Sequence, residues 1–219
     1  MPLRLIPANE YRRERWRNGL GWTKVIFAHA RRHEPESSLE GACGNVLAHV
    51  DGSALESEWD WRLSIAEIET DCAFSAFPGC DRVLVLLAGN GMRLAFDDET
   101  ETELAPPHGR VMFAGERSVQ CWLTDGPTAD FNAIVRRDRC KMQVYHRPLV
   151  GSMVFFAEAG VLWAVYLISG RATVKSAGES VGMNAGDTLL LDDAAGNDAA
   201  RSILDGGGDV LLVRIERKS

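Results

Sequence analysis

Arg62 and Ser64 stand two residues apart in a segment that alternates apolar and polar side chains. Because successive side chains of a strand point to opposite faces, both share one face, opposite Trp61, Leu63 and Ile65. A guanidinium on that face could bind a carboxylate through two parallel hydrogen bonds, and the hydroxyl beside it could add an orienting bond. On this pattern alone, the solvent-exposed face of an ordinary two-faced strand is the favoured interpretation.

Asn18 directly precedes Gly19, and Thr23 follows four residues after that glycine; the two offer an amide and a hydroxyl. Both could contact a polar ligand at the rim of a pocket. Asn-Gly is also a strong turn dipeptide, so local turn chemistry is an equal alternative.

His108 lies in a Pro-Pro-His-Gly turn and is the candidate for proton transfer, because imidazole titrates near neutral pH. A lone surface histidine is the commoner case. The chain contains no Gly-x-Ser-x-Gly elbow, phosphate-binding loop or dinucleotide fingerprint. Nucleophilic catalysis therefore finds little support.

The composition is that of a globular protein with an acidic surface. The 219 residues carry a net charge of −7 with a pI near 5.3, which argues against nucleic acid as a partner. The five cysteines form no Cys-x-x-Cys pair, so neither a zinc site nor a thioredoxin-type motif is predicted. Residues 1–7 lack the apolar core of a signal peptide, and no segment has the length and apolarity of a membrane span. We expect a cytoplasmic protein without a membrane partner.

Short strands separated by turn-rich segments must position these residues. The predicted strands are 20–28, 61–68, 83–87, 92–96, 110–113, 119–123, 164–168, 171–175, 188–191 and 210–215. Residues 45–58 carry a weak helical signal, and 206–208 are predicted as a flexible hairpin tip. An apolar run ending in glycine occurs twice, at Gly89 and Gly170, which suits two small antiparallel barrels. The predicted domains are residues 1–140, with the ligand pocket, and the smaller 141–219.

Three blocks in the first domain carry a family resemblance. They are residues 16–23 (Trp-Arg-Asn-Gly-Leu-Gly-Trp-Thr), 60–66 (Asp-Trp-Arg-Leu-Ser-Ile-Ala) and 74–82 with the Leu-Leu-x-Gly-x-Gly that follows. In this order they resemble the blocks of the HutD/Ves family, with Leu20 where a glycine is usual. The resemblance covers residues 3–137. Residues 130–132 resemble a further family segment, expected to close the first barrel in a structural role.

The resemblance implies an all-β bicupin, built from two double-stranded β-helix (cupin-like) barrels. It also implies an association with histidine utilisation, where such a protein would sense or limit flux by binding a small acidic intermediate. Urocanate and N-formylglutamate are the candidate ligands. The resemblance of residues 60–66 to a family block reverses the preference stated above: the face of Arg62 and Ser64 is expected to line the mouth of the barrel rather than to face solvent.

Metal-binding cupins resemble one another in a His-x-His pair followed by Glu and a later His, a set that holds Fe, Mn or Ni. The equivalent stretch here offers Phe77, Gly79 and Asp81, and no His-x-His occurs in the chain. We therefore predict neither a metal nor a cofactor. Asp81 is expected to point inward and to orient Arg62. Its neighbour Arg82 should face the other way and suits a structural role as well as a functional one.

The sequence predicts non-catalytic recognition of a small carboxylate. The predicted ligand-binding residues are Asn18, Thr23, Arg62, Ser64, Asp81 and Arg82. Arg62 would anchor the carboxylate, and the neutral side chains would orient it. The alternative is a metal-independent isomerase or hydrolase acting on a small acid, with His108 as general base. A pure interaction module with a vestigial pocket is a third hypothesis, and a homodimer is left open.

Overall fold

The computed structural model of the protein describes residues 3–16, 18–30, 59–192 and 201–218. Strands dominate this part, where the one helical element is the 3-10 helix η1 (Ala8–Glu10). The all-β class predicted from the sequence is confirmed. No helix within the described ranges has the length and apolar character needed to cross a membrane. The weak helical signal at 45–58 lies outside the described residues.

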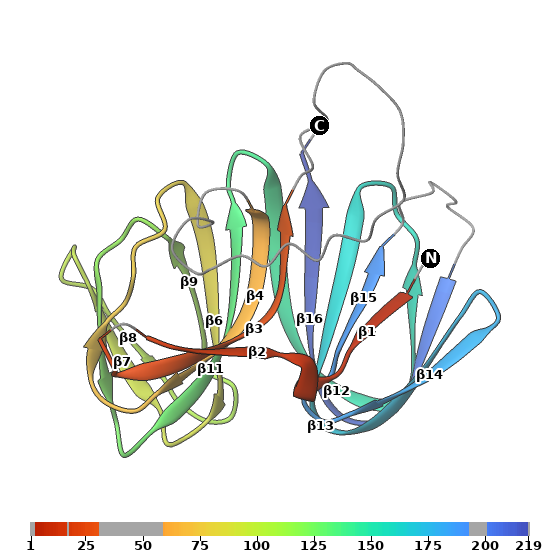
Figure 1. The fold of residues 1–219 in the computed structure, drawn as a ribbon, viewed down its shortest axis with the longest axis horizontal. Coiled ribbons are helices and arrows are strands. Elements are labelled where there is room, and N and C mark those ends of the chain that lie inside the picture. Colours follow the sequence, from red (N-terminus) through yellow and green to blue (C-terminus); the bar gives the residue numbers. More distant parts are fainter. Residues whose placement is uncertain (1–2, 17, 31–58, 193–200, 219) are drawn as a thin grey trace.

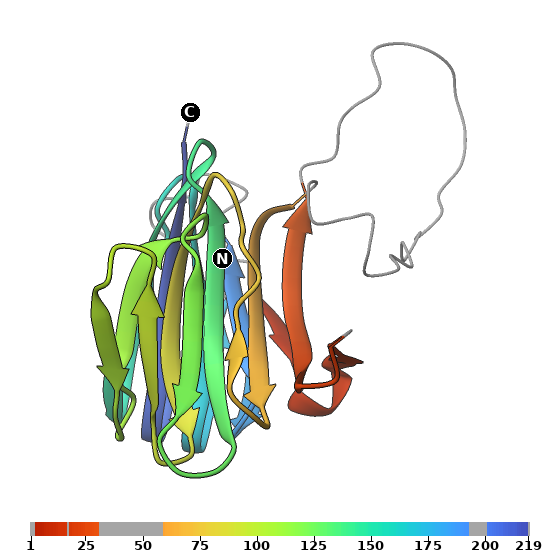
Figure 2. The ribbon, with the colours of Figure 1, turned by 90° about the vertical axis from the view of Figure 1, so that its left-hand side faces the viewer.

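The first barrel, on the left of Figure 1 and facing the viewer in Figure 2, consists of two sheets. Its strands are β2 (Arg12–Arg15), β3 (Gly21–Ala30), β4 (Trp59–Ile68), β5 (Cys72–Ala73), β6 (Cys80–Ala88), β7 (Met92–Phe96), β8 (Glu101–Leu104), β9 (Arg110–Ala114), β10 (Val119–Leu123) and β11 (Thr128–Arg136). One sheet has the order β2-β3-β4-β11-β6-β9 and the other β5-β10-β7-β8. Apolar side chains that include Leu84, Met92 and Leu94 form the core of this barrel.

The second barrel is one sheet that curls on itself (Figure 1). Its strands are β1 (Leu3–Ile6), β12 (Cys140–Phe156), β13 (Val161–Ser176), β14 (Glu179–Asn184), β15 (Thr188–Asp192) and β16 (Arg201–Arg217). The order is β1-β15-β13-β16-β12, with β14 paired to β13. Its core gathers around Leu149, Leu167 and Leu204.

Residues 206–208 lie within β16, so the prediction of a flexible hairpin tip is wrong. They pair with β13, which continues through Gly170 to Ser176 rather than ending at that glycine. A Cβ on Gly208, whose φ is +134°, would lie 1.9 Å from the carbonyl oxygen of Ser169. These glycines therefore allow two long strands to bend and approach closely.

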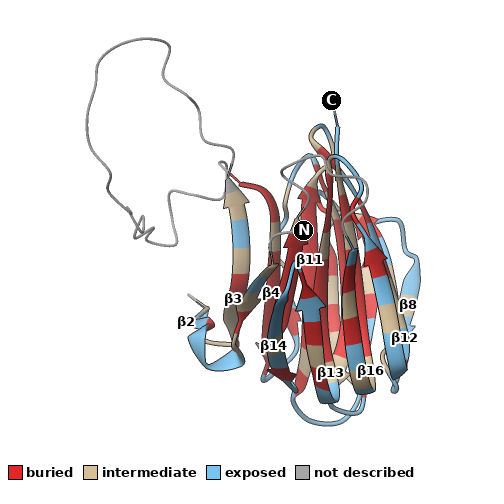
Figure 3. Ribbon diagram, turned by 90° about the vertical axis from the view of Figure 1, so that its right-hand side faces the viewer, coloured by how far each residue is buried: buried red, intermediate tan, exposed pale blue. Residues whose placement is uncertain are grey.

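A third core joins the two barrels. Trp61, Leu63 and Phe131 of the first barrel pack with Leu211 and Val213 of the second. Figure 3, which faces the second barrel, shows buried residues along β13 and β16. Both faces of β4 are consequently covered, one by the second barrel and the other by the interior of the first.

The N-terminal segment lies with the second barrel, although the sequence-based division places it in the first domain. β1 pairs with β15, and the Asp187 carboxylate accepts a hydrogen bond from the backbone N–H of Ala8 at 2.9 Å. The Tyr11 hydroxyl lies 2.6 Å from the Gly186 carbonyl oxygen. The chain thus begins in the second barrel with β1, forms the first barrel with β2 to β11, and returns to the second barrel at Cys140. The division at residue 140 stays a prediction for the rest of the chain.

Candidate functional site

Three neighbouring strands carry polar side chains into the interior of the first barrel. In β11, Asn132 pairs with Ser64 of β4, and Ile134 pairs with both Arg62 of β4 and Arg82 of β6. Paired residues of a sheet share a face, so these side chains lie on one side. That side also carries Leu84 of the barrel core. The solvent-exposed alternative for the Arg62 face is therefore wrong, because the barrel closes over it.

Burial is nearly complete for most of this group. Ser64, Arg82 and Asn132 are buried, and so are Thr128 and Asp130 on the same face of β11. Arg62 is half-buried. We call the set the interior polar cluster; its members are Arg62, Ser64, Arg82, Thr128, Asp130 and Asn132.

Arg82 is held by one hydrogen bond and three aromatic rings. Its Nη1 donates to the Ser75 carbonyl oxygen at 2.9 Å. Its guanidinium carbon lies 4.9, 5.1 and 5.7 Å from the ring centres of Phe77, Phe113 and Phe74. The Nε–H has no partner among the described residues. Burial lowers the pKa of Arg82 to about 10; Asp130 opposes that shift and Arg62 adds to it. The side chain remains charged at neutral pH and keeps a donor available.

Asp130 is 1% exposed, and neither of its carboxylate oxygens has a hydrogen-bond partner within the described part of the chain. Burial raises its pKa to about 7, although the charge of Arg82 acts in the opposite direction. In the same part of the structure, Thr128 Oγ1 and Asn132 Oδ1 also lack partners. Buried polar atoms without partners cost stability, so they mark a place where a bound molecule could supply the missing bonds.

Asp81 and Arg82 have the reverse of the expected orientation. Arg82 pairs with Ile134 on the interior face, and Asp81 therefore lies opposite Val135 on the other face. There its carboxylate accepts a hydrogen bond from Arg137 Nε at 2.7 Å. The expectation that Asp81 points inward and orients Arg62 is wrong, since strand alternation allows only one of two adjacent residues to face the interior.

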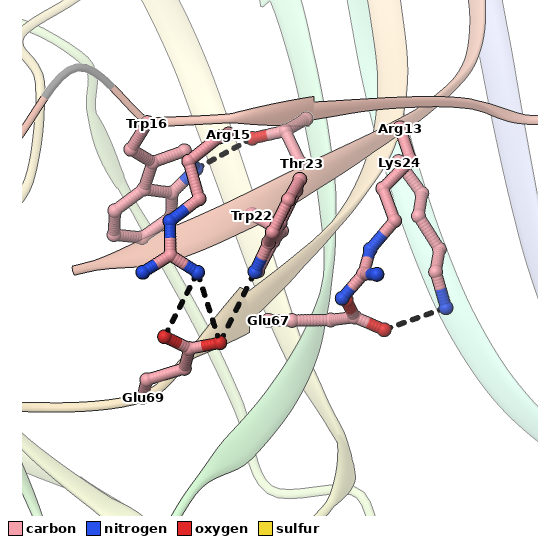
Figure 4. A network of polar contacts seen from close by, with 8 residues as sticks. All are labelled: Arg13, Arg15, Trp16, Trp22, Thr23, Lys24, Glu67 and Glu69. Atoms are coloured by element: carbon pink, nitrogen blue, oxygen red, sulfur yellow. Dashed lines mark hydrogen bonds and ion pairs between the residues drawn. The ribbon is translucent and has the colours of Figure 1, made fainter. Parts of the chain in front are cut away.

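Asn18 and Thr23 lie apart from each other. Asn18 is exposed, and its side-chain oxygen accepts a hydrogen bond from the Leu20 backbone N–H at 3.0 Å, which is the turn chemistry of the alternative interpretation. Thr23 pairs with Ala66 and so shares the face of the cluster, on the second strand from the edge of the sheet. Its hydroxyl oxygen accepts a bond from Trp16 Nε1 at 2.8 Å (Figure 4).

The hairpin of β2 and β3 is fastened to β4 by surface ion pairs. Arg13 and Lys24 contact Glu67, while Arg15 and the Trp22 ring nitrogen contact Glu69 (Figure 4). The charged residues on either side of the first family block, Arg13, Arg15 and Lys24, thus support the edge of the barrel rather than its interior.

Sequence reasoning assigned no ligand contact to Asp130, Asn132 or Thr128. The signal that could have found them is the alternation of Thr128, Asp130 and Asn132 in a run that is otherwise largely apolar. Read with the period of a strand, it places three polar side chains on one face.

His108 does not belong to the interior polar cluster. Its Nδ1 lies 3.0 Å from the Leu86 carbonyl oxygen, and its ring lies 4.6 Å from that of His146 in the second barrel. Within the described residues, no three His, Cys, Asp or Glu side chains gather in a way that could hold a metal ion. His33, His49 and Cys43 lie outside these residues.

Comparison with known proteins finds relatives over most of the chain. The family model described as HutD matches residues 8–212. A Pseudomonas putida protein described as an uncharacterized 21.2 kDa protein in the hutC 3′ region is 33% identical over 181 residues, covering 82% of this chain and 80% of that protein. Protein Ves of Cronobacter sakazakii is 32% identical over 156 residues, covering 71% and 70%.

A solved structure has the same architecture. HutD from Pseudomonas fluorescens SBW25 is 27% identical, with a TM-score of 0.71 and full coverage of both chains. Structures at 7% and 11% identity, with TM-scores of 0.65 and 0.66, are alike in fold alone. The predicted fold, a bicupin of cupin-like barrels, is confirmed.

Proposed function

The chain belongs to the HutD family, and on that premise we propose that it binds a small carboxylate metabolite in the first barrel without converting it. Its role would be regulatory or flux-limiting in histidine utilisation, in the cytoplasm. The relative from the hutC 3′ region supports the link to this pathway. The interior polar cluster is the proposed binding site.

The observation that carries this proposal is the buried guanidinium of Arg82, which has an unused N–H donor. It lies close to a second guanidinium, that of Arg62. Arg62 lies near enough to lower the pKa of Arg82, and like charges repel strongly where water is scarce. Asp130, with its pKa raised to about 7, lies close enough to Arg82 to oppose the lowering of the Arg82 pKa. A carboxylate bound close to both guanidiniums would relieve the repulsion and accept a bond from Arg82 Nε–H.

The acceptors of the cluster narrow the class of ligand further. Asp130 and Asn132 present oxygens without partners among the described residues, so the ligand should bring an N–H as well as a carboxylate. N-formylglutamate combines carboxylates with an amide N–H. Urocanate combines a carboxylate with an imidazole N–H. Both candidates suit the donors and acceptors of the cluster.

Calorimetry with these two acids tests the proposal. Arg62→Ala should weaken binding on the order of 10- to 100-fold, because a hydrogen bond to a charged group contributes about 1.5–3 kcal/mol. Arg93→Ala is the matched control, since Arg93 is exposed and pairs with Glu101 on the outside of the same barrel. The control should bind as the wild-type protein does. Unchanged affinity in folded Arg62→Ala would overturn the assignment.

A metal-independent isomerase or hydrolase acting on the same acids is the second candidate. The observation that favours it is Asp130, because a carboxyl with a pKa of about 7 can exchange protons at neutral pH. It replaces His108, which lies outside the cluster, as the candidate base. Proton NMR of each acid with the wild-type protein separates the two functions. Product that accumulates in proportion to protein concentration would reject non-catalytic binding.

A further inference from the structure

A pocket of about 430 Å³ lies where the two barrels meet. The first barrel contributes Val85, His108 and Arg110, and the second contributes Tyr145, His146, Arg147 and Leu211. We call it the inter-barrel pocket. Its volume falls in the range of small-molecule sites. It is separate from the interior polar cluster, because Val85 and Arg82 point to opposite faces of β6.

The walls carry an excess of positive charge. Arg110 donates through Nη1 to the Val144 carbonyl oxygen, and Arg147 donates to the His146 carbonyl oxygen at 3.2 Å. Each guanidinium has five N–H donors, so each bond leaves several for another acceptor. Arg147 also lies over the Tyr145 ring, 5.5 Å from its centre, which limits where its guanidinium can point. Two cations from different barrels thus line one hollow.

The carboxylate that contacts His146 of this pocket, that of Asp209, already has two partners. One oxygen of Asp209 lies 3.0 Å from His146 Nε2, and the other accepts a bond from the Ser169 hydroxyl at 3.2 Å. Asp209 therefore fixes His146 in place, and within the described residues no ion pair joins it to Arg110 or Arg147. Both guanidiniums can therefore attract an anion.

The two imidazoles add directional contacts. A carbonyl oxygen can only accept, so His108 Nδ1 donates to Leu86, and His146 Nε2 donates to the Asp209 carboxylate. The second nitrogen of each ring, Nε2 of His108 and Nδ1 of His146, has no partner among the described residues. A proton on that nitrogen turns it into a donor toward an oxyanion.

We infer that the inter-barrel pocket binds a small oxyanion, a carboxylate or a phosphate, clamped by Arg110 and Arg147 and contacted by the two histidines. A divalent metal on the imidazoles is disfavoured, because both arginines would repel it. Buried Val85 and Leu211 add apolar surface to the lining of the pocket.

NMR of the full-length protein tests this inference with inorganic phosphate and succinate as probes. Either probe should shift the imidazole signals of His108 and His146 along a saturating curve, and the probe that saturates identifies the class of anion. Arg147→Gln should weaken that binding at least tenfold. This variant should fold normally, because Arg147 is exposed and its hydrogen bond and ring contact are with residues close to it in sequence.

Arg93→Gln is the matched control, since it removes the same charge far along the chain on the outside of the first barrel. It should leave the curve unchanged, and so should Arg62→Ala, because Arg62 belongs to the interior polar cluster and does not line the inter-barrel pocket. Shifts that rise linearly with either probe would overturn the inference. Equal affinity in Arg147→Gln, or saturation by Zn²⁺ but by neither anion, would overturn it too.

Discussion

Asp130 places a titratable carboxyl inside the first barrel next to Arg82. Its pKa rises from 3.8 to about 7, mainly because burial penalises the charged form. The unfolded chain ionises near the ordinary value, so between about pH 4 and 7 the folded protein holds the extra proton. The stability that this carboxyl contributes is full below the unfolded pKa, and it is lost as the pH rises through the folded pKa.

Asp130→Asn should remove the part of the pH dependence of stability that comes from this carboxyl. The free energy of unfolding of the variant relative to the wild-type protein should rise between pH 4 and 7 and level off above 7. The total change is on the order of a few kcal/mol, at 1.36 kcal/mol per unit of pKa. Urea unfolding at four pH values from 5 to 8 measures it. Asp138→Asn alters an exposed carboxyl and serves as the control. A wild-type minus variant difference that is flat with pH would contradict the account.

β13 and β16 are the long elements on which the second barrel depends. They pair over most of their length, and the pairing shifts register between Leu167 and Ser169. Beyond that point Gly170 and Gly208 adopt φ of +87° and +134°, values that other residues rarely take. Without these glycines, side-chain atoms would occupy the space of the neighbouring backbone.

Gly208→Ala should destabilise the protein by about 3 kcal/mol or more, because it combines backbone strain with a Cβ forced against the Ser169 carbonyl oxygen. Thermal and urea unfolding would show the loss. Gly182→Ala is the matched control, since its Cβ would meet no atom within 4 Å. That substitution should change stability by less than about 1 kcal/mol. Similar losses of stability in the two variants would refute the argument that the Gly208 backbone lies too close to Ser169 for a side chain.

The whole molecule depends on a core that neither barrel can complete alone. Trp61 and Phe131 come from the first barrel and Val213 from the second, and β1 crosses from the N-terminus to pair with β15. Cutting at residue 140 would expose this apolar face and strip the second barrel of an edge strand. The two barrels are therefore expected to unfold together.

Fragments 1–140 and 141–219, produced separately, should each lack a dispersed NMR spectrum and a near-ultraviolet circular dichroism signal. The reason is that each fragment exposes the inter-barrel core to water, which forfeits about 25 cal/mol of stabilisation for each Å² of apolar surface. Mixing the fragments tests whether the shared core suffices to restore structure. A cooperative unfolding transition in either isolated fragment would show that the barrels are independent.

Local pattern predicted many of the strands. Residues 92–96 and 119–123 coincide with β7 and β10, because a short alternating run between turn residues is a signal carried by neighbours in the chain. β11 was not predicted as a strand, and its segment 130–132 was assigned a structural role. Its residues are defined by pairing with β4 and β6, which are distant in sequence.

The chain by itself determined the all-β class and the common face of Arg62 and Ser64, since two-residue alternation is a property of any strand. Only the tertiary structure decided that this face looks into a barrel, that Arg82 rather than Asp81 joins it, and that Asp130 lies there without a partner among the described residues. The physical reason is that register and coverage arise from contacts between strands far apart in sequence, and those contacts leave no local pattern.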